Sequence, residues 1–277
     1  MVDTDQAAIV RLTPDDAPAG LLLSTEAHWN QNEADWRFFL TQGTVFGVCD
    51  NEGHLVASAA LLPYSSGNAW ISMVLVTQGW RRRGLATRLV DACLAAAAAQ
   101  ALTTWLDATP AGATVYGPLG FEPTLQLRRL RLERAMSTEA EAPPSLSAIG
   151  IEQLAARDRI AMGFDRLRLL TELGARPGSR LLSNGGALAL VRDGRKARHI
   201  GPLLADGPEQ ALALVNEIVR RENGPLLIDA VHEQEPFLNG LTGSGWKIKR
   251  PFQRMRFGRA ATPPAGLPFA VAGPEFG

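Results

Sequence analysis

The residues that decide the fold read V-T-Q-G-W-R-R-R-G-L-A-T, from Val76 to Thr87. They join an apolar, β-branched run at 69–76, which predicts a buried strand, to an alanine- and leucine-rich run at 86–100, which predicts a helix. The first backbone N–H groups of such a helix have no intrahelical partner and carry the positive end of the helix dipole. Gly84 allows the chain to approach a ligand closely. This junction therefore predicts a binding site for a phosphate group.

A second motif follows the predicted helix. A short strand expected at 102–107 leads into A-T-P-A-G-A-T-V-Y-G-P-L-G-F, from Ala108 to Phe121, in which Tyr116 comes shortly before a Gly-Phe pair. Taken alone, the arginine-rich loop is compatible with a solvated surface turn, and Tyr116 with a half-buried aromatic residue. Two motifs in this order within about fifty residues are stronger evidence for a binding site than either motif alone, because a chance surface turn would not be followed by the second motif.

The spacing of Arg81, Gly84 and Ala86, with Tyr116 before the Gly-Phe pair, resembles the GCN5-related N-acetyltransferase (GNAT) superfamily. In that family the loop holds the pyrophosphate of acetyl-coenzyme A, the preceding strand holds the pantetheine, and the tyrosine acts on the departing thiolate. The resemblance implies acetyl-CoA as co-substrate and Tyr116 as the catalytic residue. Gln78 departs from the family, where proline is common, and Ala86 stands where many relatives have glycine. The implied cofactor-binding residues are Val74, Leu75, Val76, Arg81, Arg82, Arg83, Gly84, Leu85, Ala86, Thr87, Thr109, Gly112 and Tyr116.

The expected elements occur twice along the chain, which indicates a duplicated fold. The first copy is expected to contain strands at 9–12, 44–49, 55–62, 69–76, 102–107 and 125–132. Its expected helices are a pair after the turn at 13–16, whose second member includes 28–40, the helix at 86–100 and a short helix before the last strand. The second is expected to contain strands at 149–152, 180–184, 187–192, 197–204 and 226–229, and helices at 154–173, 208–222 and 235–243. The predicted fold class is α/β (α+β): two tandem GNAT folds, each a mixed, mostly antiparallel sheet flanked by helices.

The proposed boundaries are an N-terminal catalytic domain at 1–135, a linker at 136–147, a C-terminal domain at 148–260 and a tail at 261–277. The linker is proline-rich and polar. The chain resembles bacterial tandem acetyltransferases whose C-terminal copy is degenerate. The stretches that carry this resemblance are His28–Trp36, Trp70–Thr87, Leu106–Gly112, Gly163–Arg166, His199–Leu203 and the terminal A-G-P-E-F-G.

The two copies differ at the residues expected to bind the cofactor. Where the first copy has W-R-R-R-G-L-A, the second has A-D-G-P-E-Q-A, from Ala205 to Ala211. Its acidic residues would lie where a pyrophosphate rests, and like charges repel. The tyrosine is also missing, since the short helix leads into N-G-L-T-G-S-G-W. The second copy is therefore predicted not to bind coenzyme A.

The strand expected at 125–132 and the residues just after it carry several arginines. Arg128, Arg129, Arg131 and Arg134 follow one another closely. The expectation is that they decorate a solvated edge of the sheet, where charge prevents aggregation.

Composition excludes several classes of protein. The 277 residues carry 28 basic and 28 acidic side chains, so the formal net charge is zero and a nucleic-acid partner is not expected. The acidic N-terminus does not resemble a signal peptide, and no run is apolar enough to span a bilayer, so a cytoplasmic protein with no membrane partner is expected. The four histidines and two cysteines lack metal-ligand spacing, which predicts no metal site.

The acceptor site is less defined by the sequence. The helical stretch with Trp29, Asn30, Gln31 and Asp35 suits a small polar or cationic molecule, although a packed amphipathic helix is an equal alternative. Asp165 and Asp229 of the second copy are further candidates for this site, which the second copy is expected to close. Candidates for the base that deprotonates the amine are Glu26, His28, Asp35, Asp229 and His232.

The predicted function is an N-acetyltransferase that moves the acetyl group of acetyl-CoA to the amine of a small-molecule acceptor by direct attack. The alternatives are a non-catalytic acyl-CoA sensor or interaction protein, and a protein N-acetyltransferase.

Overall fold

The computed structural model describes residues 8–135, 147–148, 150–258 and 266–277. The first copy follows the predicted order. Short 3-10 turns precede α1, precede α3 and follow α4. Its elements are β1 (Ile9–Arg11), α1 (Ala17–Glu26), α2 (Glu33–Gln42), β2 (Thr44–Cys49), β3 (Leu55–Tyr64), β4 (Asn68–Val76), α3 (Leu85–Ala98), β5 (Thr103–Ala108), α4 (Pro110–Tyr116) and β6 (Glu122–Ala135).

The second copy also follows the order of elements predicted for it, apart from two differences. The expected strand at 149–152 is wrong, since α5 already begins at Ile151, and the single helix expected at 154–173 is two helices. Gly163 ends α5 with a left-handed φ of 80°, a conformation that glycine adopts at little cost. Its elements are β7 (Ser147–Ala148), α5 (Ile151–Met162), α6 (Leu167–Ala175), β8 (Arg180–Asn184), β9 (Ala187–Arg192), β10 (Arg198–Leu204), α7 (Pro208–Arg221), β11 (Gly224–Val231), α8 (Glu235–Gly243) and β12 (Lys247–Phe257). The predicted linker, 136–147, lies outside the described residues except for Ser147.

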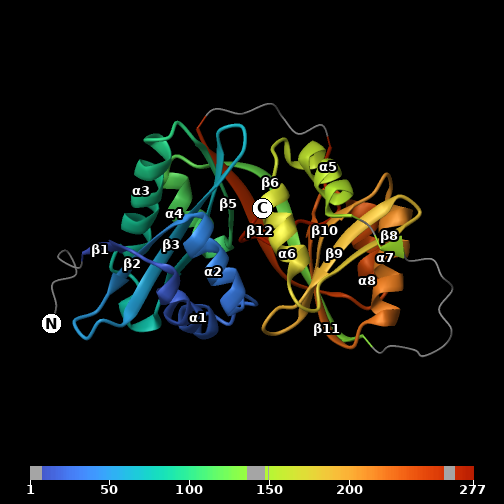
Figure 1. The fold of residues 1–277 in the computed structure, drawn as a ribbon, viewed down its shortest axis with the longest axis horizontal. Coiled ribbons are helices and arrows are strands. Elements are labelled where there is room, and N and C mark those ends of the chain that lie inside the picture. The colour runs from blue at the N-terminus through green and yellow to red at the C-terminus, as the bar shows by residue number, and fades with distance from the viewer. Residues whose placement is uncertain (1–7, 136–146, 149, 259–265) are drawn as a thin grey trace.

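The strands form one sheet in the order β1-β2-β3-β4-β5-β12-β6-β11-β10-β9-β8-β7. The pairs β4·β5 and β10·β11 are parallel, and the other named pairs are antiparallel. Figure 1 shows the two copies side by side, with α1 to α4 around the first and α5 to α8 around the second. The predicted fold class is confirmed.

The two copies exchange their last strands. β12, from the second copy, lies between β5 and β6, whereas β6, from the first copy, lies between β12 and β11. Met255 of β12 is opposite Leu106 of β5, and Arg129 of β6 is opposite Asp229 of β11. Each half of the sheet is therefore completed by a strand from the other copy.

The expectation of a solvated edge at the arginines of β6 is wrong for Arg129, because β6 is an interior strand. Arg129 is buried and forms a bidentate ion pair with Asp229: Nε to Oδ1 is 2.7 Å and Nη2 to Oδ2 is 2.8 Å. His199 Nε2 lies 2.9 Å from Asp229 Oδ2. Burial alone would raise the pKa of Asp229, but Arg129 and His199 hold that pKa below its usual range.

The last residues of the chain are buried between the copies. Phe276 stacks on Phe39 of α2, with ring centroids 5.1 Å apart, and lies in a core cluster that also contains Leu170 of α6. Arg166 Nη1 donates to the Phe276 carbonyl oxygen at 2.9 Å, and Trp70 Nε1 donates to the Pro274 carbonyl oxygen at 3.0 Å. Within the described part of the predicted tail, residues 269–276 therefore contribute to both cores, whereas Gly266 and Leu267 are exposed.

The helix expected over 28–40 begins only at Glu33. Asn32 caps it: Asn32 Oδ1 accepts from the Asp35 N–H at 3.1 Å, and Asp35 Oδ2 accepts from the Asn32 N–H at 2.9 Å. The residues before Asn32 therefore form a loop, and this loop carries Trp29 and Gln31 toward the second copy.

The ion pair between the exchanged strand and β11 predicts a large effect on stability. Asp229→Asn leaves the Arg129 guanidinium buried without its counter-charge, so the free energy of unfolding in urea should fall by about 3–5 kcal/mol. Glu133→Gln, on the strand that carries Arg129, removes a solvent-exposed partner of Arg131 and is the matched control. Equal urea midpoints for the two variants would contradict this assignment.

Candidate functional site

The site lies where β4 and β5 separate. These strands pair from Asn68 to Trp70 on β4 and from Thr103 to Trp105 on β5, and they diverge beyond these residues. The register between β3 and β4 shifts near Met73, whose φ is 51°. Ser58 Oγ donates to the Met73 carbonyl oxygen at 2.8 Å and holds this irregular backbone. Such a bulge redirects backbone groups of β4 toward the opening between the strands.

The arginine-rich loop has the conformation of an anion site at the start of α3. Gly84, the N-cap of α3, has a left-handed φ of 72°, and a Cβ at that position would meet no atom within 4 Å. Arg81 Nε donates to the Val76 carbonyl oxygen at 3.0 Å, and Arg83 lies over the Trp80 ring at 4.9 Å. The side chains of Arg81, Arg82 and Arg83 are exposed. This arrangement can receive the pyrophosphate of a coenzyme.

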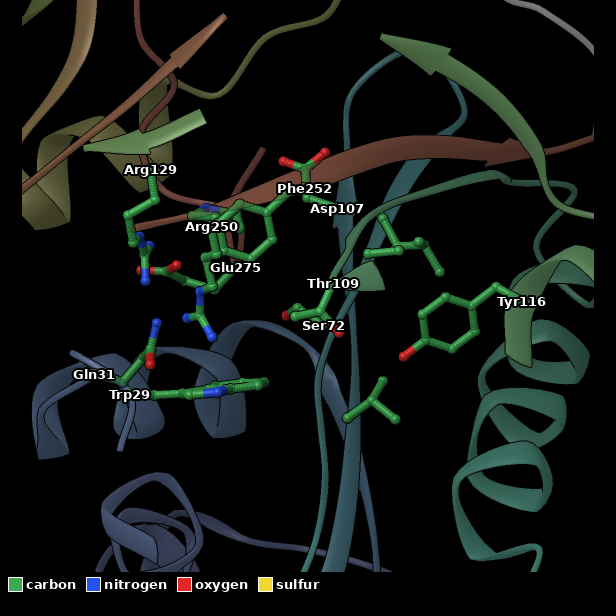
Figure 2. A pocket seen from close by; sticks show the side chains of 14 residues that line it. Trp29, Gln31, Ser72, Asp107, Thr109, Tyr116, Arg129, Arg250, Phe252 and Glu275 are labelled. Carbon is green, nitrogen blue, oxygen red and sulfur yellow. The ribbon is translucent and has the colours of Figure 1, made fainter. Parts of the chain in front are cut away.

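Tyr116 ends α4, the short helix that follows β5. Thr109 Oγ1 caps this helix by accepting from the Gly112 N–H at 3.1 Å. Tyr116 packs against Phe121 at a centroid distance of 6.0 Å, and burial raises its pKa to about 12. Figure 2 shows its hydroxyl pointing into a pocket.

That pocket connects the two copies. Of the residues predicted from the sequence, it brings together Trp29, Gln31, Val74, Thr109 and Tyr116. Figure 2 shows Arg250, Glu275 and Gln31 gathered at one end, Trp29 beside them and Tyr116 at the other end. The remaining lining residues, which were not predicted, are Ser72, Leu106, Asp107, Ala108, Arg129, Arg250, Phe252, Pro274 and Glu275.

The other acceptor candidates do not line this pocket. Asn30 joins the copies instead: its Oδ1 accepts from the Lys196 and Ala197 N–H groups at 2.9 and 3.0 Å. Asp35 caps α2 and forms an ion pair with Arg176 at 2.5 Å. Asp229 is buried against Arg129 behind the pocket wall.

Asp165 lies in a different place, where it accepts from the Leu167 N–H at 2.8 Å at the start of α6. It lines a separate pocket between the copies, together with Ser65 and Arg168.

The candidate bases are also dispersed. Glu26 Oε1 accepts from the Gln78 N–H at 2.6 Å and so supports the start of the arginine-rich loop. His28 is exposed, and neither it nor His232 lines the pocket. None of the five candidates contacts the pocket that Tyr116 enters.

Most charged groups of the pocket are already paired. Asp107 forms a bidentate ion pair with Arg254, with both distances 2.8 Å, and Arg192 Nη2 lies 3.0 Å from Glu275 Oε1. Burial raises the pKa of Asp107, while Arg254 acts in the opposite direction. The pocket is therefore charged at its walls but locally neutralised at each of these pairs.

The corresponding opening in the second copy is filled. β10 and β11 pair from 198–200 to 226–228 and then diverge. The tail enters there: the Phe269 N–H donates to the Leu203 carbonyl oxygen at 2.9 Å, and the Val271 N–H donates to the Asp229 carbonyl oxygen at 3.0 Å. The backbone groups that would face a ligand are thus bonded to residues of this chain.

The turn before α7 also differs from the arginine-rich loop. Asp206 forms an ion pair with Arg157 at 2.5 Å, and its N–H donates to Gln210 Oε1 at 3.1 Å. Pro208, the first residue of α7, has no N–H to offer. A diphosphate would meet the Asp206 carboxylate at this turn and would lack the N–H groups that the first copy presents.

Some of the pocket residues were not predicted from the sequence, and the reason is the same for each of them. Arg250, Phe252 and Glu275 reach the site through the exchanged strand and the buried tail, so no local pattern announces them. A signal existed for Asp107, which ends a predicted strand directly before the second motif.

Family models match both halves of the chain. One described as "Acetyltransferase (GNAT) family" matches residues 9–121, and one described as "Acetyltransferase (GNAT) domain" matches residues 154–266. The chain therefore belongs to the GNAT family of N-acetyltransferases and carries two GNAT domains in tandem, which confirms the resemblance read from its sequence.

Relatives extend over nearly the whole chain. An uncharacterized N-acetyltransferase, YitH of Bacillus subtilis (strain 168), is 22% identical over 247 residues, which cover 86% of this chain and 87% of YitH. A putative acetyltransferase from Pyrococcus horikoshii superposes with a TM-score of 0.80 at 20% identity, covering 97% of this chain and 95% of that one. A tandem GNAT protein from the clavulanic acid biosynthesis pathway has a TM-score of 0.65 at 15% identity, with 92% and 100% covered.

The described residues lack two kinds of feature. No group of three or more His, Cys, Asp or Glu side chains there could hold a metal ion. None of the helices built from those residues has both the length and the apolar character needed to cross a membrane.

The environment of Tyr116 predicts an unusual tyrosine titration. The chain has two tyrosines, and burial raises the pKa of both Tyr64 and Tyr116. Ultraviolet absorbance should therefore detect no tyrosinate in the folded protein below a pH of about 11. In Tyr64→Phe, the remaining tyrosine, Tyr116, should ionise with a pKa of about 12. In guanidinium both should ionise at about 10.

The raised tyrosine pKa values also make the stability of the fold depend on pH. The unfolded chain loses its tyrosine protons first, so this contribution to stability is complete below a pH of about 10 and is lost as the pH rises further. A tyrosinate signal in the folded Tyr64→Phe variant at a pH of about 10 would show that Tyr116 is not buried as described.

Proposed function

We propose that this protein transfers the acetyl group of acetyl-CoA to a small-molecule amine and that the first copy alone carries the reaction. The observation that supports this most is that Val74, from the diverging part of β4, and Tyr116 line one pocket, while β4 leads through the arginine-rich loop directly into the N-terminus of α3. The pyrophosphate would meet the N–H groups of Gly84 to Thr87 and the charges of Arg81 to Arg83. The pantetheine would lie beside Val74 to Val76, and α4, with Thr109 and Gly112 at its start, would flank it.

The fit of the coenzyme rests on the open surroundings of Gly84. A Cβ at this position would meet no atom within 4 Å, and the sequence from Gln78 to Thr87 contains no acidic residue. Acetyl-CoA supplies the thioester; the new C–N bond forms as the C–S bond breaks, and the amine proton leaves to solvent or a base.

Tyr116 acts on the thiolate that leaves. Because its pKa is raised to about 12, it is a neutral hydrogen-bond donor at physiological pH. Full transfer of its proton to a thiolate, whose acid has a pKa of about 8.5, would be uphill by roughly 5 kcal/mol. We therefore assign Tyr116 the role of stabilising the developing negative charge on sulfur by a hydrogen bond.

The second copy is proposed to close the acceptor cleft. Its own groove holds Phe269 to Val271, its turn before α7 is acidic, and its strand β12 and the tail form one end of the pocket. A pocket with walls from both copies favours a small acceptor over a folded protein surface.

An acyl-CoA sensor is the second candidate function. The same cofactor path would serve it, but it would have no use for the hydroxyl of Tyr116 next to the sulfur. Turnover therefore decides between the two.

Calorimetry tests the cofactor site. Titration of acetyl-CoA should give one site per chain, and Gly84→Glu should abolish it, because the new carboxylate repels the pyrophosphate and the left-handed backbone no longer suits the residue. Gly53→Glu is the matched control, since Gly53 also has a positive φ, of 85°, and open surroundings. Two sites, or equal loss in both variants, would contradict the proposal.

Substitution of the tyrosine tests the chemistry. Tyr116→Phe should reduce kcat about 100-fold by removing the hydrogen bond to the thiolate, while the Kd of acetyl-CoA changes by less than about threefold. Thiol release measured over a panel of amines would report kcat, and calorimetry the Kd. Unchanged turnover would remove Tyr116 from the mechanism, and the absence of turnover in the unmodified protein would favour the sensor.

A further inference from the structure

One arginine of the pocket is left without a counter-charge. Arg129 is paired with Asp229, Arg254 with Asp107, and Arg192 with Glu275. Among the described residues, the Arg250 side chain of β12 has no hydrogen-bond or ion-pair partner; its guanidinium lies over the Phe252 ring at 4.9 Å. The three pairs cancel, so the pocket retains the single positive charge of Arg250.

The position of Arg250 is electrostatically unfavourable for a charged side chain. It is half-buried, and it lies directly opposite Arg129 in the pairing of β12 with β6. Burial, followed by the like charge of Arg129, lowers the pKa of Arg250 to about 10, although the more weakly felt charges of Asp229 and Glu275 act in the opposite direction. Like charges on facing strand residues destabilise a sheet. Burial and the facing Arg129 thus both disfavour a charge in this position, and a negatively charged ligand would offset that cost.

Two neutral groups of the same pocket also lack partners. The Oε1 atom of Gln31 and the Oγ atom of Ser72 are buried and make no hydrogen bond within the described part of the chain. Gln31 is 4% exposed and Ser72 is 8% exposed, and both line the pocket with Arg250. Buried polar atoms of this kind are normally satisfied, so their free state indicates a polar ligand.

We propose that the acceptor is an amine that also carries a carboxylate, an amino acid in the broad sense, and that Arg250 binds this carboxylate. This inference rests on the proposed acetyl transfer. The single charge of Arg250 matches a carboxylate, whereas a phosphate monoester carries nearly two charges at neutral pH. A purely cationic acceptor is disfavoured, because both pocket carboxylates are already neutralised by arginines.

The arrangement of the pocket also orients such an acceptor. Figure 2 shows Arg250 at the end that Gln31 and Glu275 occupy, while the Tyr116 hydroxyl lies at the other end. The carboxylate would therefore bind away from the thioester, and the amine would extend toward Tyr116. Because Arg250 belongs to the exchanged strand, the second copy would select the acceptor for a reaction carried by the first.

Matched acceptors test this assignment. Thiol release from acetyl-CoA would be measured with the proteinogenic amino acids, β-alanine and 4-aminobutyrate, each beside its carboxamide. We expect kcat/KM for the best amino acid to exceed that for its carboxamide at least about tenfold. Arg250→Gln should lower the amino acid value by about 10- to 100-fold and leave the carboxamide value within about threefold.

Control variants separate binding from folding. Lys249→Gln changes the adjacent residue of β12, whose ammonium pairs with Glu133 outside the pocket, and should retain the preference. Arg250→Lys should restore part of it. The midpoint of thermal unfolding should stay the same or rise in Arg250→Gln, since a group without a protein partner is removed; a structural arginine would lower it.

The outcomes distinguish the two proposals. Equal use of carboxamides by the unmodified protein, or an equal loss for both acceptors in Arg250→Gln, would overturn the role of Arg250 while acetyl transfer stands. If no amine is consumed and acetyl-CoA does not bind, the proposed function fails. Calorimetry of the same amino acids with the protein alone then decides: binding that Arg250→Gln weakens supports a carboxylate site, and no binding overturns it.

Discussion

The pairing of β6 with β12 is the interaction on which the rest of the molecule depends. These two strands are the last of their respective copies, and each lies beside the diverging strand of the other copy. Backbone hydrogen bonds in the middle of the sheet thus replace an ordinary interface between two domains. The adjacent pairing of β6 with β11 buries Arg129 against Asp229, and the pairing of β6 with β12 brings Arg250 and Phe252 to the pocket that contains Tyr116. Neither copy has a complete sheet by itself.

The buried tail extends this interdependence. Phe269 to Val271 bond to both diverging strands of the second copy, and a few residues later Glu275 lines the pocket of the first. A single segment therefore fills one groove and shapes the other. A duplicated fold has two similar openings, and the tail makes them chemically different by satisfying the backbone of only one.

Prediction from the sequence succeeded where the structure is local. The strand, loop and helix around Gly84, and the capped helix that ends at Tyr116, depend on residues within a few turns of one another, so composition and spacing suffice. The failures have equally physical causes. Arg129 was expected at a solvated edge, because a strand rich in arginine looks exposed until its neighbours are known. The loop before Asn32 was expected to be helical, since its aromatic residues mimic an amphipathic pattern until the cap is seen.

The sequence by itself determined the fold class, the duplication, the arginine-rich loop and the acidic character of its counterpart at Asp206. Only the tertiary structure decided which strands complete which copy, which groove is filled and which charges remain unpaired. The reason is the distance along the chain: Arg129 meets Asp229, and Arg250 meets Arg129, across 100 residues or more. Periodicity and local motifs carry no information about such pairs, whereas the balance of buried charge depends on them entirely.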